Sequence, residues 1–178
     1  MLTIIMETRD NEAELAQTLS VLVAGAVEGL VSDVIILDHG SKDGSAHVAD
    51  AAGCRFCQDW DLAEVVRSAR GEWVMLLEPG ARPLGRWVDE LAEYVSLNRT
   101  PARFSHSRMH RKPFLSRLAR RKKPLETGFL LHKHDALAAA HGNSCLGDMT
   151  NVGSVRRLST ELVPAWVAFE GRQATVRS

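Results

Sequence analysis

Short apolar segments alternate with amphipathic segments through the first 97 residues, and this alternation restricts the fold more than any other feature. The apolar segments are residues 2–6, 34–38, 54–58 and 72–78, and segments with helical spacing follow them at 11–26, 45–53, 62–71 and 85–98. Apolar runs without polar alternation are typical of parallel strands that are covered on both faces. The sequence therefore predicts a three-layer, doubly wound, mostly parallel α/β sheet.

The two parts of the chain differ in charge, although the whole chain is neutral. Residues 1–100 hold 8 basic and 17 acidic residues, whereas residues 101–178 hold 14 basic and 5 acidic residues. A chain of 178 residues is long enough for one domain with a substantial core. We therefore expect an α/β half at residues 1–97 and a smaller basic half at residues 98–178, packed on the same domain.

The second apolar segment runs into a polar turn in the sequence VIILDHGSKDGS, residues 34–45, where Asp38 stands at the end of the strand. Ligands of open parallel sheets bind outside the carboxyl ends of the strands, so Asp38 is a candidate ligand contact. The alternative is a turn residue whose carboxylate caps the backbone that follows. Asp43 and Gly44 fit turn chemistry before a helix better than ligand binding.

Three segments stand in the order TIIMETRDNEAELAQTL, VIILDHGSKDGSAHVADAAG and SARGEWVMLLEPGARPLGRWVDEL. In this order and spacing the chain resembles the inverting family-2 glycosyltransferases. The resemblance covers residues 2–92 and is weaker at residues 127–137 and 147–148. It implies a compact or truncated nucleotide-diphosphosugar transferase (GT-A) fold, in which residues 1–97 bind a UDP- or GDP-linked sugar and the second half faces a glycan or lipid-linked acceptor.

The resemblance also implies roles for individual residues. The donor-binding residues would be Thr8, Arg9, Asp38, Gly40, Arg70 and Glu78. A carboxylate at position 38 can accept the imide or amide N–H of a base, and a glycine at position 40 lets the backbone approach the ligand. An inverting transferase needs a base that takes the proton of the acceptor hydroxyl, and the matching residue is Asp148. A helix-capping role is the alternative for Asp148.

Three positions depart from the family pattern. Glu7 replaces the usual proline after the first strand, His39 replaces a second acid after the second strand, and Gly80 replaces the second acid of the Asp-x-Asp motif. In the family the two acids of that motif hold Mg²⁺ or Mn²⁺ against the donor phosphates, and Glu78 would be the metal ligand here. A lone carboxylate is a poor site for either ion, so the sequence does not predict metal dependence.

A basic segment, RMHRKPFLSRLARRKKP, occupies residues 108–124. Its candidate membrane- or anion-binding residues are Arg111, Lys112, Arg117, Arg120, Arg121, Lys122 and Lys123. As an amphipathic helix it would lie on an anionic membrane surface, with about 1 kcal/mol from each basic residue. A solvated loop is the alternative. Nucleic-acid binding is disfavoured because Phe114 is the one aromatic residue in the run, and base stacking needs more.

Several features concern the compartment. No run approaches the ~18 apolar residues of a membrane span, and the acidic N-terminal region lacks the pattern of a secretory signal. The three cysteines suit a reducing environment, and Cys54-x-x-Cys57 indicates packing rather than a zinc or redox site. We therefore expect a cytoplasmic protein, with a peripheral position on the inner face of the plasma membrane suggested by the basic segment. No pattern indicates an oligomeric state.

Three functional hypotheses follow. The first is an inverting hexosyl-type glycosyltransferase of cell-envelope polysaccharide synthesis. The second is a catalytically inactive pseudo-glycosyltransferase that acts as a binding or regulatory partner of envelope-glycan enzymes, which the residues at positions 7, 39 and 80 motivate. A binder of nucleic acid or another anionic surface is the third and least favoured hypothesis.

Overall fold

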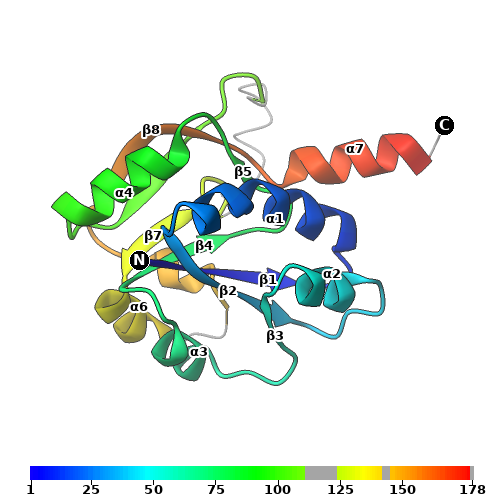
Figure 1. The fold of residues 1–178 in the computed structure, drawn as a ribbon, viewed down its shortest axis with the longest axis horizontal. Helices are drawn as coiled ribbons and strands as arrows, with labels where there is room; N and C mark the ends of the chain where they lie inside the picture. The colour runs from blue at the N-terminus through cyan, green and yellow to red at the C-terminus, as the bar shows by residue number, and fades with distance from the viewer. Residues whose placement is uncertain (111–123, 142–144, 177–178) are drawn as a thin grey trace.

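The computed structural model describes residues 1–110, 124–141 and 145–176 (Figure 1). Within these ranges the strands are β1 (Leu2–Thr8), β2 (Val31–Asp38), β3 (Arg55–Cys57), β4 (Trp73–Leu77), β5 (Arg82–Pro83), β6 (Ala102–His106), β7 (Phe129–His132) and β8 (Arg156–Val163). The helices are α1 (Glu12–Val27), α2 (Ser45–Ala51), α3 (Leu62–Ser68), α4 (Trp87–Leu97), α6 (Lys133–Ala140), the 3₁₀ helix η1 (Asp148–Thr150) and α7 (Trp166–Val176).

The strands form one sheet in the order β3-β2-β1-β4-β7-β6-β8-β5. β1 pairs in parallel with β2 and β4, and β2 pairs in parallel with β3. β7 is antiparallel to both β4 and β6, β8 is parallel to β6, and β5 is antiparallel to β8. The predicted mostly parallel α/β sheet is therefore confirmed, and strands from both halves of the chain belong to it.

Helices cover both faces of the sheet because successive strand residues point to opposite sides (Figure 1). Met6 and Leu77 pack in a core cluster with residues of α1, α2 and α4. Ile5 and Leu76 pack in a second cluster with residues of α3, α6 and η1. Two buried faces explain why these strands read as continuously apolar.

The carboxyl ends of β1, β2 and β4 lie side by side, and we call this rim the carboxyl edge. Thr8 of β1 pairs with Asp38 of β2, and Met6 of β1 pairs with Leu77 of β4. β1 is followed by its neighbour β2, whereas β4 lies on the other side of β1, so the strand order reverses between β1 and β4. Such a switch point is where open α/β sheets bind ligands.

No helix among the described residues is long and apolar enough to cross a membrane. The basic residues of the segment 111–123 lie outside the described residues.

Candidate functional site

The β1–α1 and β2–α2 loops are bound to each other at the carboxyl edge. The Asp10 carboxylate accepts the N–H of Lys42 at 2.7 Å, and the N–H of Asp10, whose φ is 53°, donates to the Ser41 hydroxyl at 3.0 Å. The N–H of Glu12 donates to the Asp43 carboxylate at 2.9 Å. Each loop thereby supplies acceptors for the backbone of the other, which gives the edge a fixed shape.

Asp43 has the turn role that its sequence context predicts. It accepts the N–H of Ser45 at 3.0 Å in addition to that of Glu12. Burial alone would raise the pKa of the Asp43 carboxyl, but hydrogen bonds from Ser45 and Glu12 outweigh it and lower the pKa below its usual value. The exposed Asp43 is therefore held as an anion by hydrogen bonds from both loops.

Asp38 shapes the loop that follows it. Its side chain is 1% exposed, and its carboxylate accepts N–H groups of Gly40 at 3.2 Å and Ser41 at 3.1 Å and the Ser41 hydroxyl at 2.5 Å. Its carbonyl oxygen accepts the indole N–H of Trp60 at 3.2 Å. Gly40 adopts a φ of 82°, which favours glycine, and is exposed. These bonds match the capping alternative for Asp38, while its contact with a ligand stays a prediction.

Glu7 and His39, two of the departures from the family pattern, contact each other. Oε2 of Glu7 lies 3.4 Å from Nε2 of His39, and the imidazole meets Trp60 edge-on with ring centroids 5.2 Å apart. Oε1 of Glu7 accepts the backbone N–H of Leu146 at 2.6 Å. Sequence reasoning missed this pair. Glu7 and His39 both differ from the pattern at the ends of neighbouring strands, and this coincidence could have indicated their contact.

The contact with Leu146 brings the segment of Asp148 to the end of β1. Asp148 is exposed and is the first residue of η1, which Gly147 caps, so its side chain does not have the capping role. Its carboxylate accepts the Cys145 thiol at 3.1 Å. Burial raises the pKa of that thiol, and the nearby carboxylates of Asp148 and Glu7 raise it further.

The structure separates Arg70 from the other candidate donor residues. Thr8 ends β1 with a buried hydroxyl that has no hydrogen-bond partner among the described residues, and the exposed Arg9 follows it. Arg70 instead precedes β4, where the N–H of Gly71 donates to the hydroxyl of Thr3 near the start of β1. The length of a seven-residue strand, about 20 Å, lies between the two edges. We therefore leave Arg70 out of the candidate site.

The turn after β4 is packed against α7. Gly80 has a φ of 95°, and a Cβ there would lie 3.0 Å from both the carbonyl oxygen of Ala165 and the Cβ of Ala168. The N–H of Gly80 donates to the hydroxyl of Thr18 at 2.7 Å. The half-buried Glu78 begins this turn. The position that the second motif acid would take is thus in contact with Ala165 and Ala168 of the α7 region.

The residues at the carboxyl edge do not fit a divalent cation. No three His, Cys, Asp or Glu side chains are grouped as metal ligands among the described residues. The remaining residues, 111–123, 142–144 and 177–178, contain none of these four residue types. In the segment that corresponds to the Asp-x-Asp motif, Glu78 is the single acid.

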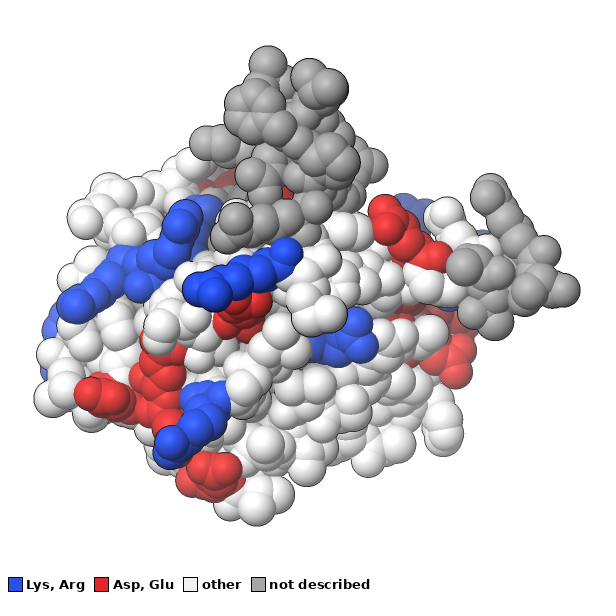
Figure 2. Space-filling model, turned by 90° about the horizontal axis from the view of Figure 1, so that it is seen from above, with Lys and Arg blue, Asp and Glu red and all other residues white. Residues whose placement is uncertain are grey.

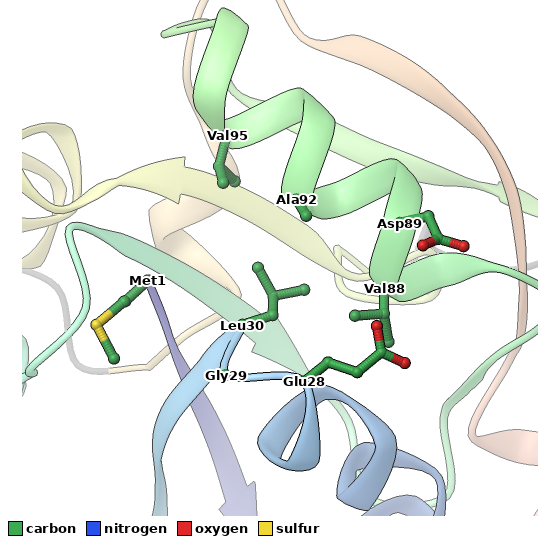
Figure 3. A pocket seen from close by; sticks show the side chains of 8 residues that line it. All are labelled: Met1, Glu28, Gly29, Leu30, Val88, Asp89, Ala92 and Val95. Atoms are coloured by element: carbon green, nitrogen blue, oxygen red, sulfur yellow. The ribbon is translucent and has the colours of Figure 1, made fainter.

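Two hollows lie elsewhere on the described surface. One, of about 280 Å³, lies between the end of α1 and α4 and is lined by Met1, Glu28, Gly29, Leu30, Val88, Asp89, Ala92 and Val95 (Figure 3). The other, of about 500 Å³, lies between α4 and β8. Both are remote in the fold from the ends of β1 and β2, so the candidate site rests on the carboxyl edge alone.

Comparison with known proteins bears on the fold. No family model matches the sequence, and no curated protein matches it. Glucosyl-3-phosphoglycerate synthase from Mycobacterium tuberculosis, in complex with Mn²⁺, UDP and glucosyl-3-phosphoglycerate, has a similar structure with a TM-score of 0.59 and 14% identity. The similarity covers 92% of this chain and 71% of that one. S. aureus TarS 1-349 is similar with a TM-score of 0.62 and 10% identity, over 96% of this chain and 62% of that one.

The fold is the GT-A fold. At these identities the similarity shows the fold alone. The chain is also shorter than these two structural neighbours, since the match spans 71% of the first and 62% of the second. The expected compact or truncated GT-A architecture is thereby confirmed.

Proposed function

We propose that this protein is an inverting glycosyltransferase of the family-2 type, which transfers a sugar from a UDP- or GDP-linked donor to a glycan or lipid-linked acceptor in cell-envelope polysaccharide synthesis. One observation carries the proposal: on a GT-A fold, the switch point between β1 and β4 collects Thr8, Asp38 and the segment of Asp148 at one edge. In this proposal residues 1–97 bind the donor, and residues 98–178 face the acceptor.

The reaction assigns a role to each group. The acceptor hydroxyl attacks the anomeric carbon, the new carbon–oxygen bond forms as the bond to the diphosphate breaks, and the electron pair leaves with the diphosphate. Asp148 takes the proton of the hydroxyl. Arg9 and the hydroxyl of Thr8 bind the donor, and the Asp38–Gly40 turn presents backbone to the base. The solved neighbour that contains UDP and glucosyl-3-phosphoglycerate supports a nucleotide and an acceptor on this fold.

Binding of the donor is the first test. Isothermal titration calorimetry with UDP and with GDP should give micromolar to millimolar affinity for one of them, and Thr8→Val should weaken it about tenfold or less. Thr18→Val is not a suitable control because Thr18 supports the Gly80 turn. Thr100→Val, at an exposed position beyond α4, is the matched control. A titration without heat or saturation for either nucleotide would refute the proposal.

Turnover is the second test. A panel of UDP- and GDP-sugars is incubated with the protein, and release of the nucleotide is measured with and without candidate acceptors. Asp148→Asn should lower the rate by about 10²–10⁴-fold and leave nucleotide affinity unchanged. Asp135→Asn, which replaces a partly exposed acid in the first turn of α6, should have no effect.

The pseudo-glycosyltransferase is the alternative function, which the residues at positions 7, 39 and 80 motivate. It predicts no turnover for any donor, whether or not a nucleotide binds. The donor panel separates the two functions, and calorimetry separates a pseudoenzyme that binds a nucleotide from one that does not.

The basic segment suggests where the protein acts. His106 ends β6 and Phe129 begins β7, and both lie at the carboxyl edge because β6 runs parallel and β7 antiparallel to β4. The basic residues between them would bind the protein to an anionic surface near the donor site. Such binding suits a lipid-linked acceptor at the cytoplasmic face of the membrane. On the face seen in Figure 2, both basic and acidic side chains of the described residues are present.

A further inference from the structure

We infer that the carboxyl edge forms no divalent-cation site, and that a nucleoside diphosphate bound there, as the proposed function requires, is bound without a cation. The inference contrasts with the solved neighbour, in which Mn²⁺ accompanies UDP on the same fold. It rests on the geometry of the turn after β4 and on the partners of the surrounding acids.

A second carboxylate at position 80 would be both strained and crowded in the turn after β4. Gly80 adopts a φ of 95°, a region that side chains of L-residues rarely enter. The side on which its Cβ would stand is filled by Ala165 and Ala168 of the α7 region, each 3.0 Å from the Cβ position. The glycine at position 80 therefore goes together with close packing of the α7 region against the turn.

The same turn is fixed from the opposite side by α1. The hydroxyl of Thr18 accepts the N–H of Gly80 at 2.7 Å and donates to the carbonyl of Ala81 at 3.0 Å. α7 is fixed as well, because Arg172 lies 3.2 Å from the carboxylate of Glu14, whose side chain is 1% exposed. A rearrangement that opened the turn for a cation would break buried hydrogen bonds and a partly buried ion pair.

The acids at the ends of β1 and β2, and Asp148 beside them, already have partners within the protein. Glu7 binds His39 and the N–H of Leu146, and Asp38 binds the backbone of its own loop. Asp148 accepts the Cys145 thiol. Mg²⁺ at nucleotide sites is held by one or two carboxylates together with phosphate oxygens, and the turn after β4, residues 78–81, contains the single acid Glu78.

Electron paramagnetic resonance of Mn²⁺ tests the first part of the inference directly. The amplitude of the free Mn²⁺ signal is followed while the protein is added, up to a twofold excess over the metal. The signal should fall no more with the wild type than with Glu78→Gln. A stoichiometric loss of signal that Glu78→Gln abolishes would overturn the inference.

Calorimetry with UDP and GDP tests the second part, in buffer with EDTA and in buffer with MgCl₂ or MnCl₂. The dissociation constant of the nucleotide that binds should differ by less than about twofold between the buffers. Binding that is tenfold or more tighter with metal would overturn the inference and leave the proposed function standing. If neither nucleotide binds in any buffer, the proposed function and the nucleotide part of the inference are refuted, and the Mn²⁺ titration still decides whether the cation site exists.

A variant that restores the missing acid gives an independent test. Gly80→Asp should gain no Mn²⁺ binding and should melt at a lower temperature than Gly85→Asp. Gly85 is the matched control because it also has a positive φ, of 61°, but no atom lies within 4 Å of its Cβ position. Mn²⁺ binding by Gly80→Asp at an unchanged melting temperature would overturn the inference.

Discussion

Replacement of Gly80 by alanine should destabilise the protein through its contact with α7. Two costs combine at this position. A non-glycine residue at positive φ costs about 1–2 kcal/mol, and a methyl group forced into a packed site costs about 1–3 kcal/mol. The added Cβ at position 80 would have two neighbours at 3.0 Å and a third, Cα of Ala165, at 3.4 Å. Gly80→Ala should therefore lower the free energy of unfolding by about 2–5 kcal/mol.

Gly85→Ala isolates the backbone term, because its φ of 61° is also positive and its Cβ position is open. It should cost about 1–2 kcal/mol. Urea denaturation followed by circular dichroism measures both variants, and each kcal/mol corresponds to about 2–4 °C in Tm for a chain of this size. Equal destabilisation by the two variants would refute the contact between the Gly80 turn and α7.

A double-mutant cycle locates the excess cost at α7. Ala168→Gly removes one of the two groups 3.0 Å from the Cβ position. Combined with Gly80→Ala, it should recover about 1 kcal/mol relative to the sum of the single variants. Strict additivity would place the crowding elsewhere.

Three further predictions concern the α4–β8 contact, the candidate base and the basic segment. Hydrogen bonds from β8 outweigh burial and lower the pKa of Glu90, so the stability it contributes is full above its ordinary pKa of 4.5 and is lost as the pH falls through the lowered value. Glu90→Gln should cost about 1–3 kcal/mol at pH 7 and flatten the acid limb of urea denaturation, whereas the exposed Glu93→Gln should do neither. Cys145 should react slowly with iodoacetamide at pH 8 because its pKa is raised, and Asp148→Asn should speed the reaction as measured by mass spectrometry; an unchanged rate would contradict the contact. Replacement of the four basic residues at 120–123 by glutamate should abolish co-sedimentation with anionic vesicles, and retained binding would contradict the membrane proposal.

The fold was predictable from the sequence to the extent that the pattern was local. The first four apolar segments became β1, β2, β3 and β4, and of these β1, β2 and β4 place apolar side chains on both faces of the sheet. The insertion of the antiparallel β7 between β4 and β6 was not predictable, because the four residues Phe129–His132 carry no signal of their neighbours. Strand order depends on contacts between distant segments, which a periodicity does not contain.

The candidate site was predictable where it follows from strand ends. Thr8 and Asp38 lie together at the carboxyl edge as the sheet rule requires. Arg70 does not, since α3 carries the chain back to the opposite edge before β4 begins. The bond between Glu7 and Leu146 spans 139 positions, and the packing of Gly80 on α7 likewise joins segments far apart in the sequence. Such pairs exist only once the tertiary structure is formed.

The residues at positions 7, 39 and 80, where the sequence differs from the pattern that it resembles, contact other parts of this chain. Both oxygens of Glu7 have partners, one in His39 and one in the N–H of Leu146. A proline at position 7 would leave that N–H without its acceptor, and an acid at position 80 would crowd Ala165 and Ala168. Glu7, His39 and Gly80 thus have structural partners within this chain. Under the proposed function, the carboxyl edge would hold the charge of a bound diphosphate without a cation.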